Sequence, residues 1–105
     1  MPRLSETPGA RALSRQMIAE NTVALVGAFL ERDLDEVEFR ALLVTGDAER
    51  LGLSILGNAS RSVLFKVRDS GKTRETCHLS SEIELVVAAA ASAIQELRVA
   101  KATTL

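Results

Sequence analysis

The hydrophobic positions follow a helical period at both ends of the chain. From residue 10 to about residue 32, apolar side chains recur at spacings of three and four, as on an amphipathic helix. The Thr-Pro pair at 7–8 suits the start of this helix, because proline at the first helical position loses no hydrogen bond. Residues 81–84 read Ser-Glu-Ile-Glu, a capping box that predicts a second helix running to about residue 100.

Between these two helices, apolar and polar residues alternate with a period of two. The alternation covers four short runs, at 37–43, 51–55, 63–67 and 73–79, with turn-forming residues between them. Such runs predict an antiparallel meander with one buried face, although 47–57 also fits a short helix. We therefore expect the α+β fold class, with a two-layer domain whose four-stranded antiparallel meander is flanked by an N-terminal and a C-terminal helix (α-β-β-β-β-α).

Length and composition favour one soluble domain. The 105 residues are the size of a single domain, 1–105, and we expect its ends, 1–7 and 101–105, to be flexible. The chain has no Trp or Tyr, which disfavours recognition by stacking, and its net charge of −1 gives no bulk attraction to a polyanion. Its single cysteine forms no internal disulfide. Without an apolar leader or a membrane-length apolar run, we expect a cytoplasmic protein with no membrane association.

The stretch DSGKTRETCHL, residues 69–79, holds the residues most suggestive of chemistry. Its Gly-Lys-Thr triplet does not make a phosphate loop, because Lys66 stands where that loop needs its first glycine. Cys77 and His78 are neighbours on a predicted strand, so their side chains project to opposite faces and form no catalytic pair. Two residues are also too few for a structural zinc site. We expect a tight turn and a returning strand here, and no enzyme activity, cofactor or metal.

Basic residues are concentrated in the third run and the turn that follows it. Five of them surround one acid between positions 61 and 74, namely Arg61, Lys66, Arg68, Lys72 and Arg74. On a hairpin they would contact nucleic-acid phosphates or an acidic partner. The alternative interpretation, which we favour, is a solvated strand face whose charge guards an edge against aggregation. A third is self-pairing with the acidic connector at 31–38 of a second copy.

Several apolar or small residues fall on faces that the predicted fold turns outward. Leu42 and Leu64 lie on the solvent face of the predicted sheet, and the last helix places Leu85, Ala89 and Ser92 away from its buried row. A two-layer domain with a second apolar surface usually hides it in an oligomer. We therefore predict a homodimer through the sheet or the last helix, with these five residues as candidate interface.

The text LVVAAAASAIQELR at 85–98, together with the helix–meander–helix order, resembles the YbaB-type nucleoid-associated proteins, as does VTGDAERLGLSILG at 44–57. The resemblance covers about half the chain. The first helix lacks the charged, Met- and Gln-rich character of that family, and no site residue is carried over. Members of the family are small dimers, so the resemblance implies a dimer and raises the expectation of nucleic-acid association.

Taken alone, the sequence predicts a small soluble protein–protein interaction or regulatory module that acts as a homodimer and is non-catalytic. One alternative is a nucleic-acid-associated dimer that binds through the basic residues of 61–74. Another is a small ligand-binding module or an enzyme of unknown reaction, with a pocket between helices and sheet.

Overall fold

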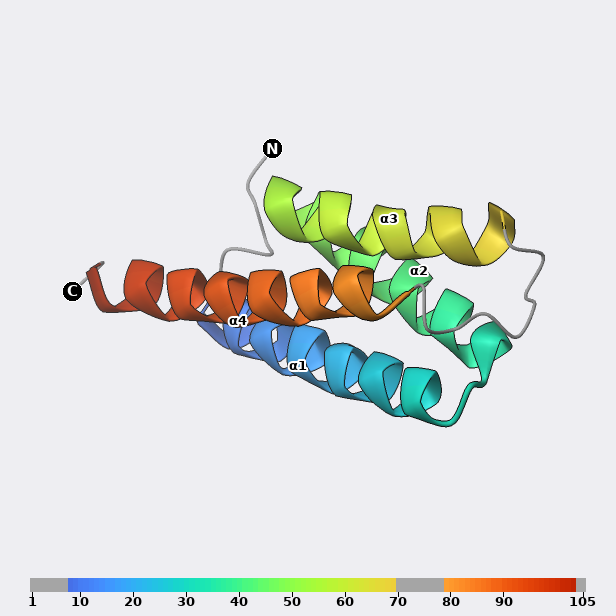
Figure 1. The fold of residues 1–105 in the computed structure, drawn as a ribbon. Helices are drawn as coiled ribbons and strands as arrows, with labels where there is room; N and C mark the ends of the chain where they lie inside the picture. The colour runs from blue at the N-terminus through green and yellow to red at the C-terminus, as the bar shows by residue number, and fades with distance from the viewer. Residues whose placement is uncertain (1–7, 70–78, 104–105) are drawn as a thin grey trace.

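The computed structural model describes residues 8–69 and 79–103, and within them the chain forms four α-helices and no strand. The helices are α1 (Pro8–Leu30), α2 (Leu34–Leu51), α3 (Ser54–Asp69) and α4 (Ser80–Thr103). Consecutive helices run antiparallel and α4 packs beside α1, so the four form an up-and-down bundle (Figure 1). The helices expected at the two ends are present. The α+β prediction is wrong, because helices occupy the described part of the predicted meander.

The first predicted strand lies within α2, a helix that is apolar on two opposite faces. Its inward residues recur at spacings of four, three and four, namely Val37, Ala41, Val44 and Ala48. Phe39, Leu42 and Leu43 lie on the outward face instead. Two apolar faces on one helix place an apolar residue at almost every second position, which imitates the period of a strand. The alternation at 37–43 therefore has a helical cause.

The second predicted turn lies inside α3. Gly57 and Ser60 are turn-forming residue types, yet both are buried in this helix, and Ser60 has no exposed surface. The Ser60 hydroxyl lies 3.0 Å from the carbonyl oxygen of Leu56, an acceptor one turn back along the same helix. A small polar residue thus occupies a core position without an unsatisfied hydroxyl. The fourth predicted strand lies outside the described residues except for Leu79.

The two described reversals of the chain, from α1 to α2 and from α2 to α3, use the same type of turn. Gly52 ends α2 with φ 72°, and its neighbour Leu53 donates from its amide to the carbonyl oxygen of Ala48 at 2.8 Å. Arg32 ends α1 in the same left-handed conformation, with φ 61°. The following residue, Asp33, donates from its amide to an α1 carbonyl at 2.9 Å. Both are Schellman motifs, which normally place glycine at the left-handed position.

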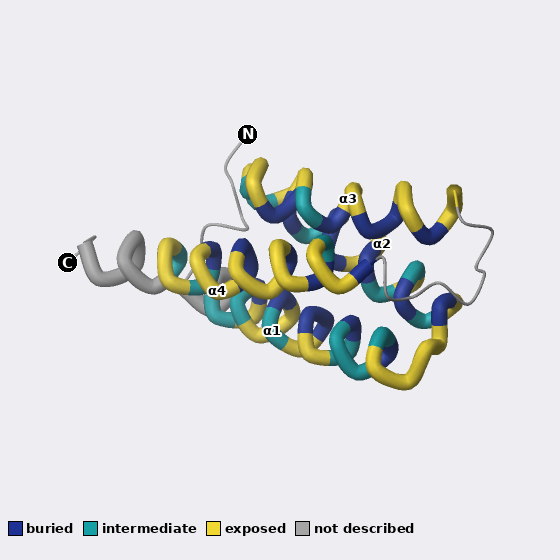
Figure 2. Tube along the Cα trace, in the orientation of Figure 1, coloured by how far each residue is buried: buried dark blue, intermediate teal, exposed yellow. Residues whose placement is uncertain are grey.

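The core runs along the bundle axis and all four helices contribute to it. The burial pattern shows one inward stripe on each helix (Figure 2). The side chains without exposed surface are aliphatic or small, and the largest of them are Ile18, Leu25, Leu56, Val37, Val44, Val63, Val67 and Val86. None of the three phenylalanines belongs to this buried set, since Phe39 and Phe65 are exposed and Phe29 is only partly buried. Phe29 packs against the edge of the core, and the fully buried set contains no aromatic side chain.

Candidate functional site

The described members of the predicted basic cluster lie on α3, and each is paired with an acid on a neighbouring helix. Arg61 binds Glu49 at 3.0 Å, and Arg68 binds Glu38 at 2.8 Å, so both connect α3 to α2. Lys66 lies 3.3 Å from Glu82 of α4. Such half-exposed pairs contribute at most about 1 kcal/mol each. Lys72 and Arg74, the other two members, lie outside the described residues.

These pairings change what the basic residues can do. A nucleic-acid surface presents cations to phosphates, and an acid that is paired with a cation offsets its charge locally. Arg61, Lys66 and Arg68 connect helices through such pairs. The hairpin on which they were expected is a helix in this region.

The five predicted interface residues do not form one surface. Leu64 and Ala89 are buried in the core, at 6% and 8% exposure. Leu42 lies on the outside of α2, whereas Leu85 and Ser92 lie on the outside of α4. Because α2 and α4 each pack mainly against α1 and α3, their outward faces point to opposite sides of the bundle. The structure thus separates the prediction into two surfaces.

The first surface is the outward face of α2. Phe39 is 49% exposed, Leu42 46% and Leu43 37%. The guanidinium of Arg40 lies 5.4 Å from the centre of the Phe39 ring, within the range of a cation–π contact. The strand prediction placed Phe39 and Leu43 on its buried face, so their exposure on a helix was not expected. Their helical spacing with Leu42 was the signal that could have revealed it.

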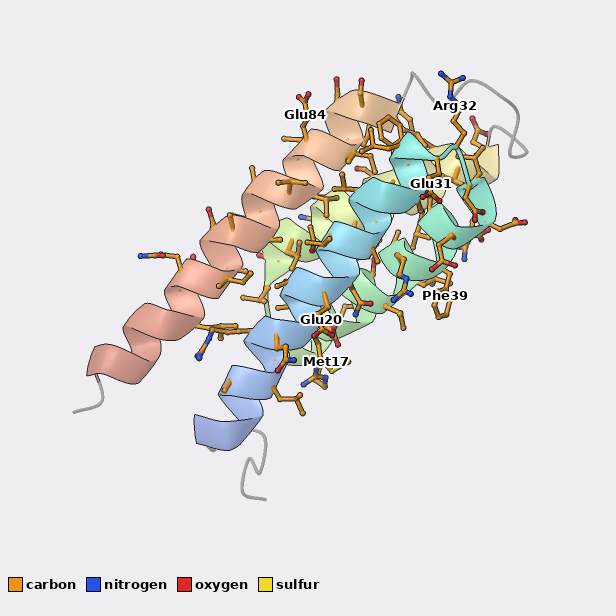
Figure 3. The ribbon with its side chains drawn as sticks, turned by 90° about the horizontal axis from the view of Figure 1, so that it is seen from below. Met17, Glu20, Glu31, Arg32, Phe39 and Glu84 are labelled. Carbon is orange, nitrogen blue, oxygen red and sulfur yellow. The ribbon has the colours of Figure 1, made fainter. Side chains whose placement is uncertain are left out.

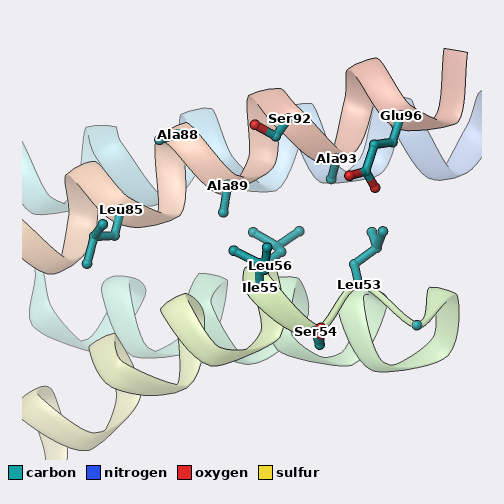
Figure 4. Close-up of a pocket in the computed structure, with 11 residues that line it drawn as sticks. Leu53, Ser54, Ile55, Leu56, Leu85, Ala88, Ala89, Ser92, Ala93 and Glu96 are labelled. Atoms are coloured by element: carbon teal, nitrogen blue, oxygen red, sulfur yellow. The ribbon is translucent and has the colours of Figure 1, made fainter. Parts of the chain in front are cut away.

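Two grooves flank the outward face of α4 and make up the second surface. The α2–α3 turn, the first residues of α3 and the helix α4 enclose a groove of about 340 Å³, into which Ala89 and Ala93 point from α4 toward Leu53 and Leu56 (Figure 4). Leu85 and Ser92 also line it, and Glu96 is its single charged residue. A second groove of about 350 Å³ lies between α1 and α4. It is lined mainly by apolar residues that include Leu30 and Val87.

Buried and half-buried polar side chains connect the helices. The Thr45 and Ser60 hydroxyl oxygens lie 2.7 Å apart between α2 and α3, and both residues are buried. Arg40 donates to the side-chain oxygen of Asn21 on α1 at 3.0 Å and to Glu36 at 2.7 Å. The hydroxyls of Thr45 and Ser60 contact each other and main-chain carbonyl oxygens of their own helices, and none of these contacts is a base that could activate a nucleophile. These contacts fix the helices relative to one another.

The other chemistry considered from the sequence finds no support in the described residues. No group of three or more His, Cys, Asp or Glu side chains within 8–69 and 79–103 is placed to hold a metal ion. Cys77 and His78 lie outside that part of the chain. None of the described helices combines the length and apolar character required to cross a bilayer.

Comparison with known proteins adds no family. No family model matches the chain, and neither a curated protein nor a solved structure shows significant similarity to it. The helix–meander–helix order behind the resemblance to YbaB-type proteins is replaced by a helical bundle.

Proposed function

We propose that the chain is a small, non-catalytic interaction module that acts as a homodimer. One observation carries this proposal. Large apolar side chains are exposed on the surface of the bundle, among them Phe39, Leu42 and Leu43 side by side on α2. Contiguous apolar surface on a soluble domain typically marks an interaction site.

Charge and burial favour this function over the alternatives. The described cations of the 61–74 cluster are paired within the bundle, so a phosphate surface has little support there. The buried hydroxyls of Thr45 and Ser60 face each other and are not accessible to a ligand. We further propose a cytoplasmic location, because a single cysteine provides no internal disulfide.

Sedimentation velocity over a wide protein concentration range, at low and at high salt, tests the proposal. We expect a species with the mass of two chains that persists at high salt, because burial of apolar surface is not screened by ions. A monomer at every concentration would contradict the homodimer. Adding mixed-sequence duplex DNA tests the alternative. A complex that forms at low salt and dissociates at high salt would favour the nucleic-acid function instead.

A further inference from the structure

The outward face of α2 carries a stripe of residues whose spacing reads the same in both directions. Their positions differ by four, three, one, three and four, and all lie opposite the buried face of the helix. We call them the α2 stripe, and they are Asp35, Phe39, Leu42, Leu43, Gly46 and Arg50. Helical geometry places them within a sector of about 100°. The stripe is thus a single linear surface along the whole helix.

The two halves of the α2 stripe are also complementary in size and charge. If a second α2 packs antiparallel with residues 42 and 43 at the two-fold axis, each Leu42 faces the partner's Leu43. In that register Phe39 lies opposite Gly46, above which a Cβ would meet nothing within 4 Å. The end of the helix that carries Asp35 then meets the end that carries Arg50. Arg50 also binds Asp47 of its own helix at 2.9 Å, and its guanidinium has further N–H donors for a second carboxylate. An isologous interface requires such self-complementarity.

We infer that this chain forms an antiparallel α2–α2 dimer, with Leu42 and Leu43 at its centre and Asp35 of each subunit beside Arg50 of the other. This inference rests on the proposed homodimer and names its surface and register. A bulky side chain facing an open glycine permits close approach of the two helices. The paired termini then select the antiparallel orientation over the parallel one, because parallel packing brings like charges together.

The sides of the α2 stripe do not oppose this approach. On the α3 side, Glu38 and Glu49 carry negative charge, but Arg68 and Arg61 neutralise them. On the other side, Met17 of α1 is 39% exposed and lies on the same side of the bundle as Phe39, away from α4 (Figure 3). Met17 thus adds one exposed apolar side chain on this side of the bundle.

The contact area of the proposed dimer is small, and this area sets its expected affinity. The 18 residues of α2 span about 27 Å, and one helix with its edges provides less area than the roughly 800 Å² per partner of a standard interface. We therefore expect a dimer that dissociates on dilution.

Two matched substitutions identify the surface, measured by sedimentation equilibrium with circular dichroism as the folding control. Leu42→Lys places two cations at the two-fold axis and should raise the dimer dissociation constant at least about tenfold. Leu85→Lys alters a comparably exposed leucine on the opposite side of the bundle, and should leave that constant unchanged. If Leu85→Lys dissociates the dimer and Leu42→Lys does not, the α2 interface is wrong while the homodimer stands. A wild-type monomer at all concentrations overturns both.

A charge swap tests the register. Asp35→Lys and Arg50→Glu should each weaken the dimer about threefold or more, and the double variant should restore it. Both changes place charges that oppose the dipole of α2. Of the three variants, the double variant should therefore have the lowest free energy of unfolding and yet form the strongest dimer. Restoration by the double variant supports the antiparallel register even if Leu42→Lys and Leu85→Lys both dissociate the dimer. Failure of the double variant to restore association overturns it.

Discussion

The hydroxyl pair between α2 and α3 predicts strong non-additivity of two substitutions. Thr45 and Ser60 have one hydroxyl proton each, yet their oxygens lie 2.7 Å apart and also 2.8 Å and 3.0 Å from the carbonyl oxygens of Ala41 and Leu56. The Ser60 oxygen also lies 3.2 Å from the carbonyl oxygen of Gly57, so four contacts share two protons. When one hydroxyl is removed, the other still donates to its own helix carbonyl, so no buried donor is left unsatisfied.

The size of each effect follows from these contacts. Ser60→Ala loses the interhelical hydrogen bond and should lower the free energy of unfolding by about 1 kcal/mol. Thr45→Val loses the same bond and puts a methyl group near the Ser60 oxygen, although such contacts need about 3.5 Å. We expect it to cost about 2 kcal/mol. In the double variant the new methyl group fills the space of the missing hydroxyl, so the combined cost should be near zero.

Urea denaturation followed by circular dichroism measures all four proteins at one concentration, so that any association contributes equally. The two substitutions should couple by at least about 1 kcal/mol in favour of the double variant. On heating, the single variants should melt lower by about 4 to 8 °C for each kcal/mol lost. Costs that simply add would refute the shared-proton account and show that the two hydroxyls act independently.

The helix ends give two further predictions. Arg32→Gly should raise the free energy of unfolding by about 1 kcal/mol and Gly52→Ala should lower it by about 1 to 2 kcal/mol, because both positions have a positive φ that side chains resist; equal signs in chemical denaturation would contradict this. Asp33 accepts from the amide of Glu36 at 3.2 Å and caps α2, so Asp33→Ala should cost about 1 kcal/mol, whereas Asp33→Ser should retain most of the stability.

The helix ends were more predictable from sequence than the middle of the chain. Pro8 begins α1 as the Thr-Pro pair indicated, and the serine-rich start of α4 lies within one residue of its predicted position. The connector before α2 also carried a readable signal, because Asp33 is followed three residues later by Glu36, the spacing of an N-terminal capping box. That signal was local and polar, and the apolar alternation outweighed it.

In α3 the difficulty was a core position occupied by a polar residue. Leu56, Val63 and Val67 have helical spacing, but Ser60, which completes the row, is not apolar. Its burial depends on Thr45, fifteen residues away. A pattern of apolar residues cannot register a hydroxyl that is buried because it bonds to carbonyl oxygens of its own helix and to a hydroxyl of another helix. The interior of α3 was for this reason divided into a turn and a strand.

In α2 the error and the proposed function have the same cause. A helix with one apolar face shows a period near 3.6 and is recognised as a helix. Phe39, Leu42 and Leu43 add a second face that the core does not use, and they obscure that period. Their contribution to the fold of one chain is small, since they lie on its surface. The proposed association with a second chain would give them a physical role, because it would bury them. An apolar pattern that fits no single-chain helix is therefore itself an argument for an interface.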